Sequence, residues 1–169
     1  MAVKRILLSG ALRAVVGEVG CPSGEQIVNG GFEEGWTGWD HNEYAFVTEG
    51  DAHSGVYKCW LYWDEIGGEP IEEHFGWVEQ ILPTPITVDC VQSLKFWAKS
   101  QYGASTFVYA IITYTDDSVQ SIEVLVVGPN YTECDITANL IQGKTIKKIR
   151  FTWAADPFYL DDVSLIGKG

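Results

Sequence analysis

The stretch Asn29-Gly-Gly-Phe-Glu-Glu-Gly-Trp-Thr-Gly-Trp39 stands near the start of the chain, and Phe158-Tyr-Leu-Asp-Asp-Val-Ser-Leu165 stands near its end. The residues between them form short apolar runs that turn residues separate, and no helical period is sustained. Short strands at a spacing of roughly ten to twelve residues are typical of an all-β sandwich.

We expect strands wherever an apolar run lies between two turn signals such as Gly67-Gly68-Glu69-Pro70 or Gly128-Pro129-Asn130. The expected strands are 26–33, 44–48, 56–63, 75–82, 92–100, 105–114, 119–127, 131–136, 146–153 and 158–166. The acidic segment 64–73 is expected to be an exposed loop, and 137–143 is one of few stretches that permit a helix.

The two quoted motifs carry a family resemblance. An opening Asn-Gly-x-Phe-Glu followed by a Trp, and a closing strand of the form Asp-Asp-Val-x-Leu, resemble the jelly-roll carbohydrate-binding modules of the galactose-binding-domain-like superfamily. The resemblance covers residues 25–166 and implies a jelly-roll β-sandwich of two antiparallel sheets. We therefore divide the chain into an extended N-terminal arm, 1–24, and a jelly-roll domain, 25–169.

Within the expected strand 92–100, side chains alternate between two faces. Leu94, Phe96 and Ala98 share one face, which we assign to the core. The other face carries Trp97 between two lysines, so Trp97 is expected to point outward. We expect Trp39 and Trp77 in the core.

Charge and cysteine content exclude several classes of function. The formal net charge of −12 argues against nucleic acid as a partner, because phosphate binding needs a basic surface. Cys21, Cys59, Cys90 and Cys134 lie far apart without a C-x-x-C pair, so a zinc site is not expected. They allow two disulfides in an oxidising compartment or, equally, small buried apolar side chains.

Residues 1–20 combine a basic start with an apolar middle, as a signal peptide does, but Arg13 interrupts the apolar stretch. The stretch is also too short to span a membrane. We expect an assembly arm that adds a strand either to its own sandwich or to the sheet edge of a neighbouring subunit. Its apolar residues are Ile6, Leu7, Leu8, Leu12, Val15 and Val16.

A calcium site is the first candidate constellation. The resemblance implies a structural Ca²⁺ with the closing-strand Asp161 as a ligand, and carboxylate and carbonyl oxygens are what this ion prefers. Glu33 is expected to meet Asp161 because the first and last strands lie close together, and Asp161 has the inward parity of Val163. The expected metal residues are Glu33, Asp51, Asp161 and Asp162, and the alternative is that they cap loops or pair with basic residues.

The second constellation is aromatic. Trp60 and Tyr62 alternate along one expected strand, and Trp97 and Tyr109 are expected to join them on one outer sheet face. Flat rings there serve either for stacking on glycans or for contact between subunits.

Enzymatic motifs are missing from the sequence, which has no H-E-x-x-H, G-x-S-x-G or P-loop. We therefore expect a non-catalytic protein that is extracellular or on a virion surface. The favoured hypothesis is a virion-surface decoration or filament-forming subunit, a homo-oligomer or part of a larger protein assembly. The alternative is a secreted, calcium-stabilised module that binds a polysaccharide or a cell-surface glycan.

Overall fold

The computed structural model describes residues 20–66, 69–153 and 156–169, and it is an all-β sandwich of two antiparallel sheets. The strands of the first sheet are β1 (Ser23–Glu25), β3 (Ala45–Glu49), β4 (Tyr57–Leu61), β8 (Val91–Ser100), β11 (Thr132–Asp135) and β13 (Phe158–Lys168). The strands of the second are β2 (Asp40–His41), β7 (Trp77–Thr87), β9 (Thr106–Tyr114), β10 (Val119–Val126) and β12 (Thr145–Trp153).

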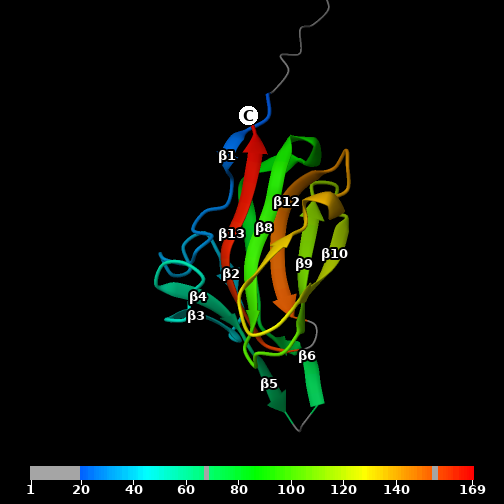
Figure 1. Cartoon of the computed structure of the whole chain (residues 1–169). Coiled ribbons are helices and arrows are strands. Elements are labelled where there is room, and N and C mark those ends of the chain that lie inside the picture. The colour runs from blue at the N-terminus through cyan, green and yellow to red at the C-terminus, as the bar shows by residue number, and fades with distance from the viewer. Residues whose placement is uncertain (1–19, 67–68, 154–155) are drawn as a thin grey trace, which may run out of the picture.

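Both sheets interleave strands that are distant in the sequence, as a jelly roll does. The first sheet, here called the β8 sheet, has the order β11-β8-β13-β4-β3, and β1 pairs with β13. The second, here called the β12 sheet, has the order β10-β9-β12-β7-β2. A hairpin of β5 (Trp63–Ile66) and β6 (Glu69–Phe75) projects from the end of the sandwich opposite to β1 (Figure 1). The expectation of a loop over 64–73 is therefore wrong, because most of this segment belongs to the two strands of the hairpin.

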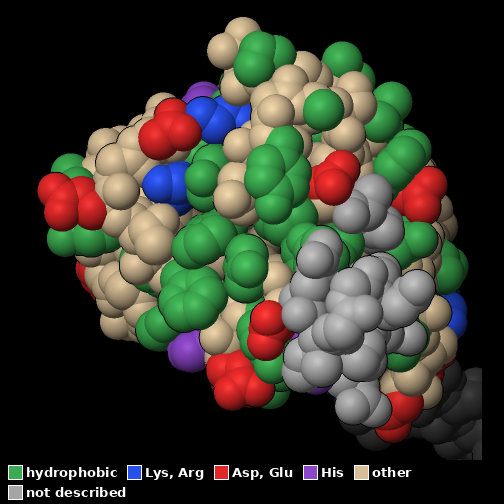
Figure 2. Space-filling view, turned by 90° about the horizontal axis from the view of Figure 1, so that it is seen from below, with side chains coloured by type: hydrophobic (Ala, Val, Ile, Leu, Met, Phe, Trp, Pro, Cys, Tyr) green, Lys and Arg blue, Asp and Glu red, His purple; other side chains and the backbone are tan. Residues whose placement is uncertain are grey.

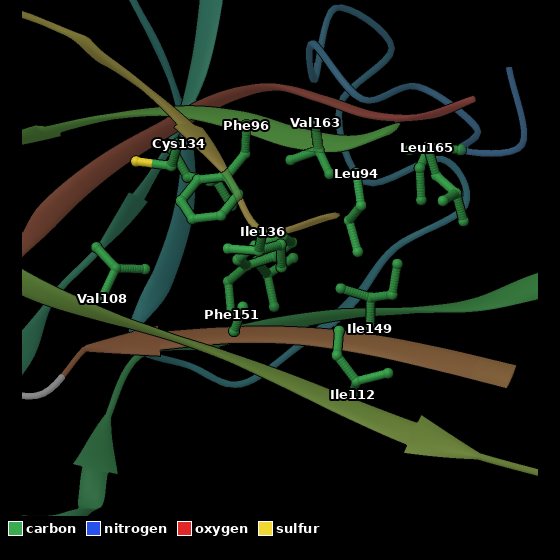
Figure 3. Packing of buried hydrophobic residues seen from close by; sticks show 14 of the residues in the cluster. Leu94, Phe96, Val108, Ile112, Cys134, Ile136, Ile149, Phe151, Val163 and Leu165 are labelled. Atoms are coloured by element: carbon green, nitrogen blue, oxygen red, sulfur yellow. The ribbon is translucent and has the colours of Figure 1, made fainter. Parts of the chain in front are cut away.

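The core lies between the two sheets, where Leu94 and Phe96 of β8 face Ile149 and Phe151 of β12 (Figure 3). Leu94, Phe96 and Ala98 are fully buried, which confirms the face assigned from their alternation. Trp39 is buried as expected. The two short 3-10 turns are η1 (Val88–Cys90) and η2 (Thr137–Asn139). In the part of the chain that the structure describes, no helix is long and apolar enough to cross a membrane.

The opening motif forms a turn-rich loop, so the strand expected over 26–33 is wrong. Asn29 and Phe32 adopt left-handed backbone angles, with φ of 53° and 57°, which a strand does not allow. The Asn29 amide donates hydrogen bonds to the carbonyl oxygens of Gly35 and Thr37, and its Oδ1 accepts one from the Glu34 backbone. The motif is therefore a closed loop that its first side chain holds together.

This loop is attached directly to the closing strand. The Val163 backbone N–H donates to the Gly30 carbonyl oxygen over 3.0 Å. A Cβ atom added at Gly30 would lie 1.9 Å from the Val163 carbonyl oxygen, so only glycine allows this approach. The two motifs that carry the family resemblance are thus in contact with each other.

One disulfide joins Cys21 to Cys90, which links the start of the described chain to the connection between β7 and β8. Cys59 and Cys134 are buried free thiols, as the alternative of small apolar side chains predicts. Burial raises the pKa of the Cys134 thiol to about 12, which keeps it protonated and unreactive.

We predict that Gly30→Ala destabilises the domain by about 1–3 kcal/mol, because the new methyl group overlaps the Val163 carbonyl. Gly20→Ala is the matched control, since a Cβ at Gly20 meets no atom within 4 Å. Urea unfolding followed by tryptophan fluorescence measures both. Equal midpoints for the two variants would contradict the close contact between the motifs.

Candidate functional site

The outer face of the β12 sheet carries a row of side chains that crosses four neighbouring strands. The strand pairing sets Trp77 opposite Thr152, Thr152 opposite Tyr109 and Tyr109 opposite Glu123. Between Trp77 and Tyr109 lies one intervening strand, so their backbones are about 10 Å apart. Two aromatic rings are therefore presented on one side of one sheet.

Charged side chains form the next row on this face. Arg150 is paired with Glu79 on β7 and with Ile111 on β9. Its guanidinium carbon lies 4.1 Å from the centre of the Trp77 ring, and its Nε donates to Glu79 Oε2 over 2.7 Å. Lys148 approaches the same Glu79 oxygen at 3.3 Å. We refer to Trp77, Glu79, Tyr109, Lys148 and Arg150 together as the Trp77 face.

The expectation that Trp77 lies in the core is wrong, and the alternation of β7 gives the reason. Val78 and Leu82 point inward and are buried, so Trp77, Glu79 and Ile81 point outward. Tyr109 also lies on this face, because its neighbours Val108 and Ala110 fill the core. The expectation that Tyr109 shares an outer face with Trp60 and Trp97 is therefore wrong, since those two belong to the β8 sheet.

Trp60 and Tyr62 lie together outside the β8 sheet, as expected. Their ring centres are 5.1 Å apart, and Phe46 on β3 lies 5.6 Å from Trp60 and is 42% exposed. The Trp60 indole nitrogen donates to Gln101 Oε1 over 2.8 Å, which fixes the plane of the ring. We refer to Phe46, Trp60 and Tyr62 as the Trp60 cluster. Seen from the end that carries the β5–β6 hairpin, the surface shows many hydrophobic side chains (Figure 2).

Trp97 points outward from β8, as predicted, but another side chain covers it. The His53 imidazole stacks on its ring, with centres 3.8 Å apart and planes inclined by 13°. His53 Nδ1 lies 2.6 Å from Asp162 Oδ2, so a carboxylate of the closing strand holds the imidazole in place. One face of the Trp97 ring is thus occupied within the domain.

The expected calcium residues lie around the loop 50–57, which covers part of the β8 sheet. Asp161 is fully buried, and its Oδ2 accepts hydrogen bonds from the backbones of His53 and Ser54. Burial raises the pKa of Asp161 to about 6, although the backbone hydrogen bonds oppose this shift. Its expected parity is wrong, because the register shifts between Asp161 and Ser164 and pairs Asp161 with the outward Trp97.

Glu33 contacts the same loop from the opening motif. Its Oε1 accepts hydrogen bonds from the backbones of Val56 and Tyr57. Glu33 and Asp161 thus accept hydrogen bonds from neighbouring backbone N–H groups of the same loop, those of Val56 and Tyr57 and those of His53 and Ser54. Both alternatives named from the sequence, loop capping and metal binding, involve this pair.

The other two expected metal residues have protein partners. Asp51 forms an ion pair with Lys99 at 2.5 Å, and Asp162 holds His53 and the Ser54 hydroxyl. Over residues 20–66, 69–153 and 156–169, no three acidic, histidine or cysteine side chains are arranged to hold a metal ion. Asp161 forms no ion pair with a basic side chain there. Backbone N–H groups satisfy both oxygens of this buried carboxylate, since Asp162 donates to Oδ1 and His53 and Ser54 donate to Oδ2.

Comparison with known proteins identifies the class of fold. No family model matches the chain, and no curated protein matches it. Solved structures of carbohydrate-binding modules do match, so the fold is the jelly roll of that type. At identities of 19% or less, these matches establish the fold alone.

Three of the matching structures illustrate the likeness. A family 61 module in complex with β-1,4-galactotriose has a TM-score of 0.55 at 19% identity, and the match covers 85% of this chain and 99% of that one. A family 16 module has a TM-score of 0.59 at 17% identity, with 83% and 99% covered. The family 22 and catalytic modules of a Clostridium thermocellum xylanase, complexed with xylohexaose, give 0.63 at 15% identity, with 88% and 29% covered.

The comparisons give no support to the virion-surface or filament hypothesis. All six residues expected to form its assembly arm, from Ile6 to Val16, lie outside the described residues. The arm was assigned to 1–24, and the described part of it is bound to the jelly roll through β1 and the Cys21–Cys90 disulfide.

Sequence reasoning missed Glu79, Lys148 and Arg150 and misplaced Trp77. The alternation that places Trp77 outward was present in Trp77-Val78-Glu79-Gln80-Ile81-Leu82, where Val78, Gln80 and Leu82 point inward. Gln80 concealed it, because this polar residue is buried and bonds the Val28 backbone through both its amide atoms.

Proposed function

We propose that this chain is a non-catalytic glycan-binding module and that the Trp77 face is its binding surface. The observation that carries the proposal is the pair of outward rings, Trp77 and Tyr109, on one sheet with charged side chains in the neighbouring rows of the same face. Matching modules were solved with a galactotriose, a xylohexaose and a mixed-linked tetrasaccharide, which supports a polysaccharide as the ligand.

The chemistry of the face suits a chain of sugars. A sugar ring presents an apolar C–H face, which packs on the flat electron-rich face of an aromatic ring. The two rings are carried by backbones about 10 Å apart. This spacing suits an oligosaccharide better than a single sugar, because the two contacts then lie on different units of one chain. Arg150, Lys148 and Glu123 supply hydrogen-bond donors and acceptors for hydroxyl groups between and beside the rings.

The Trp60 cluster is a second candidate surface, favoured by the hydrogen bond from Trp60 to Gln101 that fixes the indole before any ligand arrives. Trp97 and Trp77 each have one ring face covered within the domain, by His53 and by Arg150, so a sugar would pack on the other face of either ring. Extracellular location is part of the proposal, since the Cys21–Cys90 disulfide is typical of an oxidising compartment.

We predict that Trp77→Ala lowers affinity for the polysaccharide that the wild type retains by about tenfold or more, since a buried aromatic contact is a typical hot spot. Affinity electrophoresis through gels containing galactan, xylan or mixed-linkage glucan measures it. Tyr109→Ala is expected to act in the same direction, and both variants should unfold near the wild-type midpoint because the two side chains lie outside the core.

Trp60→Ala is the matched comparison on the opposite sheet. Loss of retention in Trp60→Ala with full retention in Trp77→Ala would transfer the proposed site to the Trp60 cluster. If none of these gels retains the wild type, and no polysaccharide of a broad array binds it, the glycan-binding proposal is wrong.

We also propose a structural Ca²⁺ held by Glu33 and Asp161 together with backbone carbonyl oxygens. The ion would neutralise the buried Asp161 carboxylate and fasten the opening motif to β13 and the loop 50–57. Its support is that Asp161 and Glu33 both bind the loop 50–57 and that Asp161 is buried without a basic partner in the described residues.

We predict that calcium at about a hundred times its dissociation constant stabilises the domain by about 2.7 kcal/mol, because only the folded state binds it. Thermal unfolding with added calcium or chelator measures this. Asp161→Asn should lose the response, whereas Asp117→Asn, at an exposed ion pair with Lys147, should keep it. Identical melting of the wild type in calcium and in chelator would rule the ion out.

A further inference from the structure

The Trp77 face has an unusual charge arrangement for this acidic chain. Among the ion pairs of the described residues, Glu79 is the one carboxylate that has two basic partners, Lys148 and Arg150. Both contact the same oxygen, Oε2, at 3.3 Å and 2.7 Å. The group of three therefore retains one positive charge, while Asp40, opposite Glu79 on β2, and Glu123, opposite Tyr109 on β10, place two carboxylates nearer the edges of the same face.

Burial determines which of these charges a ligand meets. The Glu79 side chain is only 11% exposed, whereas the side chains of Lys148 and Arg150 are 28% and 32% exposed. The two cations thus lie over the carboxylate on the side that faces solvent. A ligand that approaches the centre of the face meets the ammonium and guanidinium groups before it meets Glu79.

Arg150 also has guanidinium N–H donors that are not used within the described part of the protein. Its one side-chain hydrogen bond within residues 20–66, 69–153 and 156–169 uses Nε. Its stacking on Trp77 uses the plane of the guanidinium and not the N–H edge. The two terminal nitrogens therefore have no protein acceptor in that part of the chain. A carboxylate matches such an N–H edge in a bidentate geometry that a neutral hydroxyl group cannot reproduce.

From this arrangement we infer that the Trp77 face selects glycans that carry carboxylate groups, such as polymers with uronic acid units. The inference rests on the proposed glycan-binding function and names the class of its ligand. The carboxylate binds Arg150 and Lys148 in the rows beside the rings, and neighbouring sugar rings pack on Trp77 and Tyr109. Glu79 is a positioning residue, because it holds both cations under the ligand without touching it.

Two matched pairs of probes test the inference with the full chain. One is glucuronoxylan and the same xylan after removal of its glucuronate; the other is polygalacturonate and the same polymer after reduction of its carboxyl groups. In at least one pair, the acidic member should bind about tenfold more tightly at low salt, as a charge-assisted bidentate contact allows. The preference should shrink when sodium chloride rises from about 0.05 M to about 0.5 M, because salt screens exposed charges.

Variants separate this selectivity from a general effect of charge. Lys148→Gln and Arg150→Gln should each reduce the ratio of acidic to neutral affinity, by about threefold or more for Arg150→Gln. Lys147→Gln is the matched control, because it removes the same charge from the neighbouring residue, whose partner is the exposed Asp117. Its ratio should stay within error of the wild type.

Each outcome decides between the two proposals. Equal or tighter binding of the neutral members in both pairs, abolished by Trp77→Ala, would overturn the carboxylate selectivity and leave the glycan-binding function standing. An equal loss of preference in Lys147→Gln and Arg150→Gln would assign the effect to net charge and overturn the inference. Binding to neither member of either pair would overturn this inference, and failure on the broad array would overturn the proposed function as well.

Discussion

The closing strand β13 is the constraint on which the other parts of the molecule depend. It pairs with β8 along one side, and with β4 and then β1 along the other. Between its pairing with β4 and with β1, the register shifts, and the backbone accommodates the opening motif through the bond from Val163 to Gly30. The same irregular segment directs Asp161 and Asp162 to the loop 50–57. One bulge therefore joins the opening motif, the closing strand and a surface loop.

This bulge also explains why the two outer faces of the sandwich differ. The loop 50–57 is held over the β8 sheet by Asp161, by Glu33 and by the ion pair of Lys99 with Asp51. Its His53 stacks on Trp97 and occupies a ring that the sequence presents as a binding group. On the β12 sheet, the side chains of Ile81 and Val119 remain exposed to solvent at 72% and 63%. The two sheets are alike in one respect, because Arg150 lies against one face of the Trp77 ring as His53 lies against one face of the Trp97 ring.

The fold was predictable from the sequence because alternation and turn residues are local signals. Strands such as β8, β9 and β12 follow directly from their apolar parity, and their ends were placed within a residue or so. The segment 26–33 was mispredicted because its apolar residues serve a loop, whose left-handed Asn29 is held by hydrogen bonds from within the opening motif, such as that from the Trp39 indole to the Asn29 carbonyl. Asp161 was placed on the wrong face for a related reason, since a bulge breaks the parity on which the prediction depended.

The candidate site was less predictable because it depends on which sheet each strand joins. Tyr109 and Trp97 both lie on outward faces, and nothing local in the sequence shows that β9 and β8 belong to different sheets. Glu79 is about seventy residues away from Lys148 and Arg150 in the sequence, and only the pairing of β7 with β12 brings it next to them. A charged group assembled in this way is invisible to composition, because the net charge of −12 describes the chain and not the face.

The partial burial of Glu79 gives the Trp77 face its physical character. A carboxylate at the surface would cancel the charge of one cation and leave the other solvated. With its side chain only 11% exposed, it instead orients both of them, and the two ion pairs partly offset the desolvation cost of its burial. Arg150 in turn lies against the ring of Trp77, so the position of an aromatic platform and that of a charged anchor are coupled through a single side chain. The strand pairing that builds the core thereby also fixes how the aromatic and the charged side chains of this face are spaced.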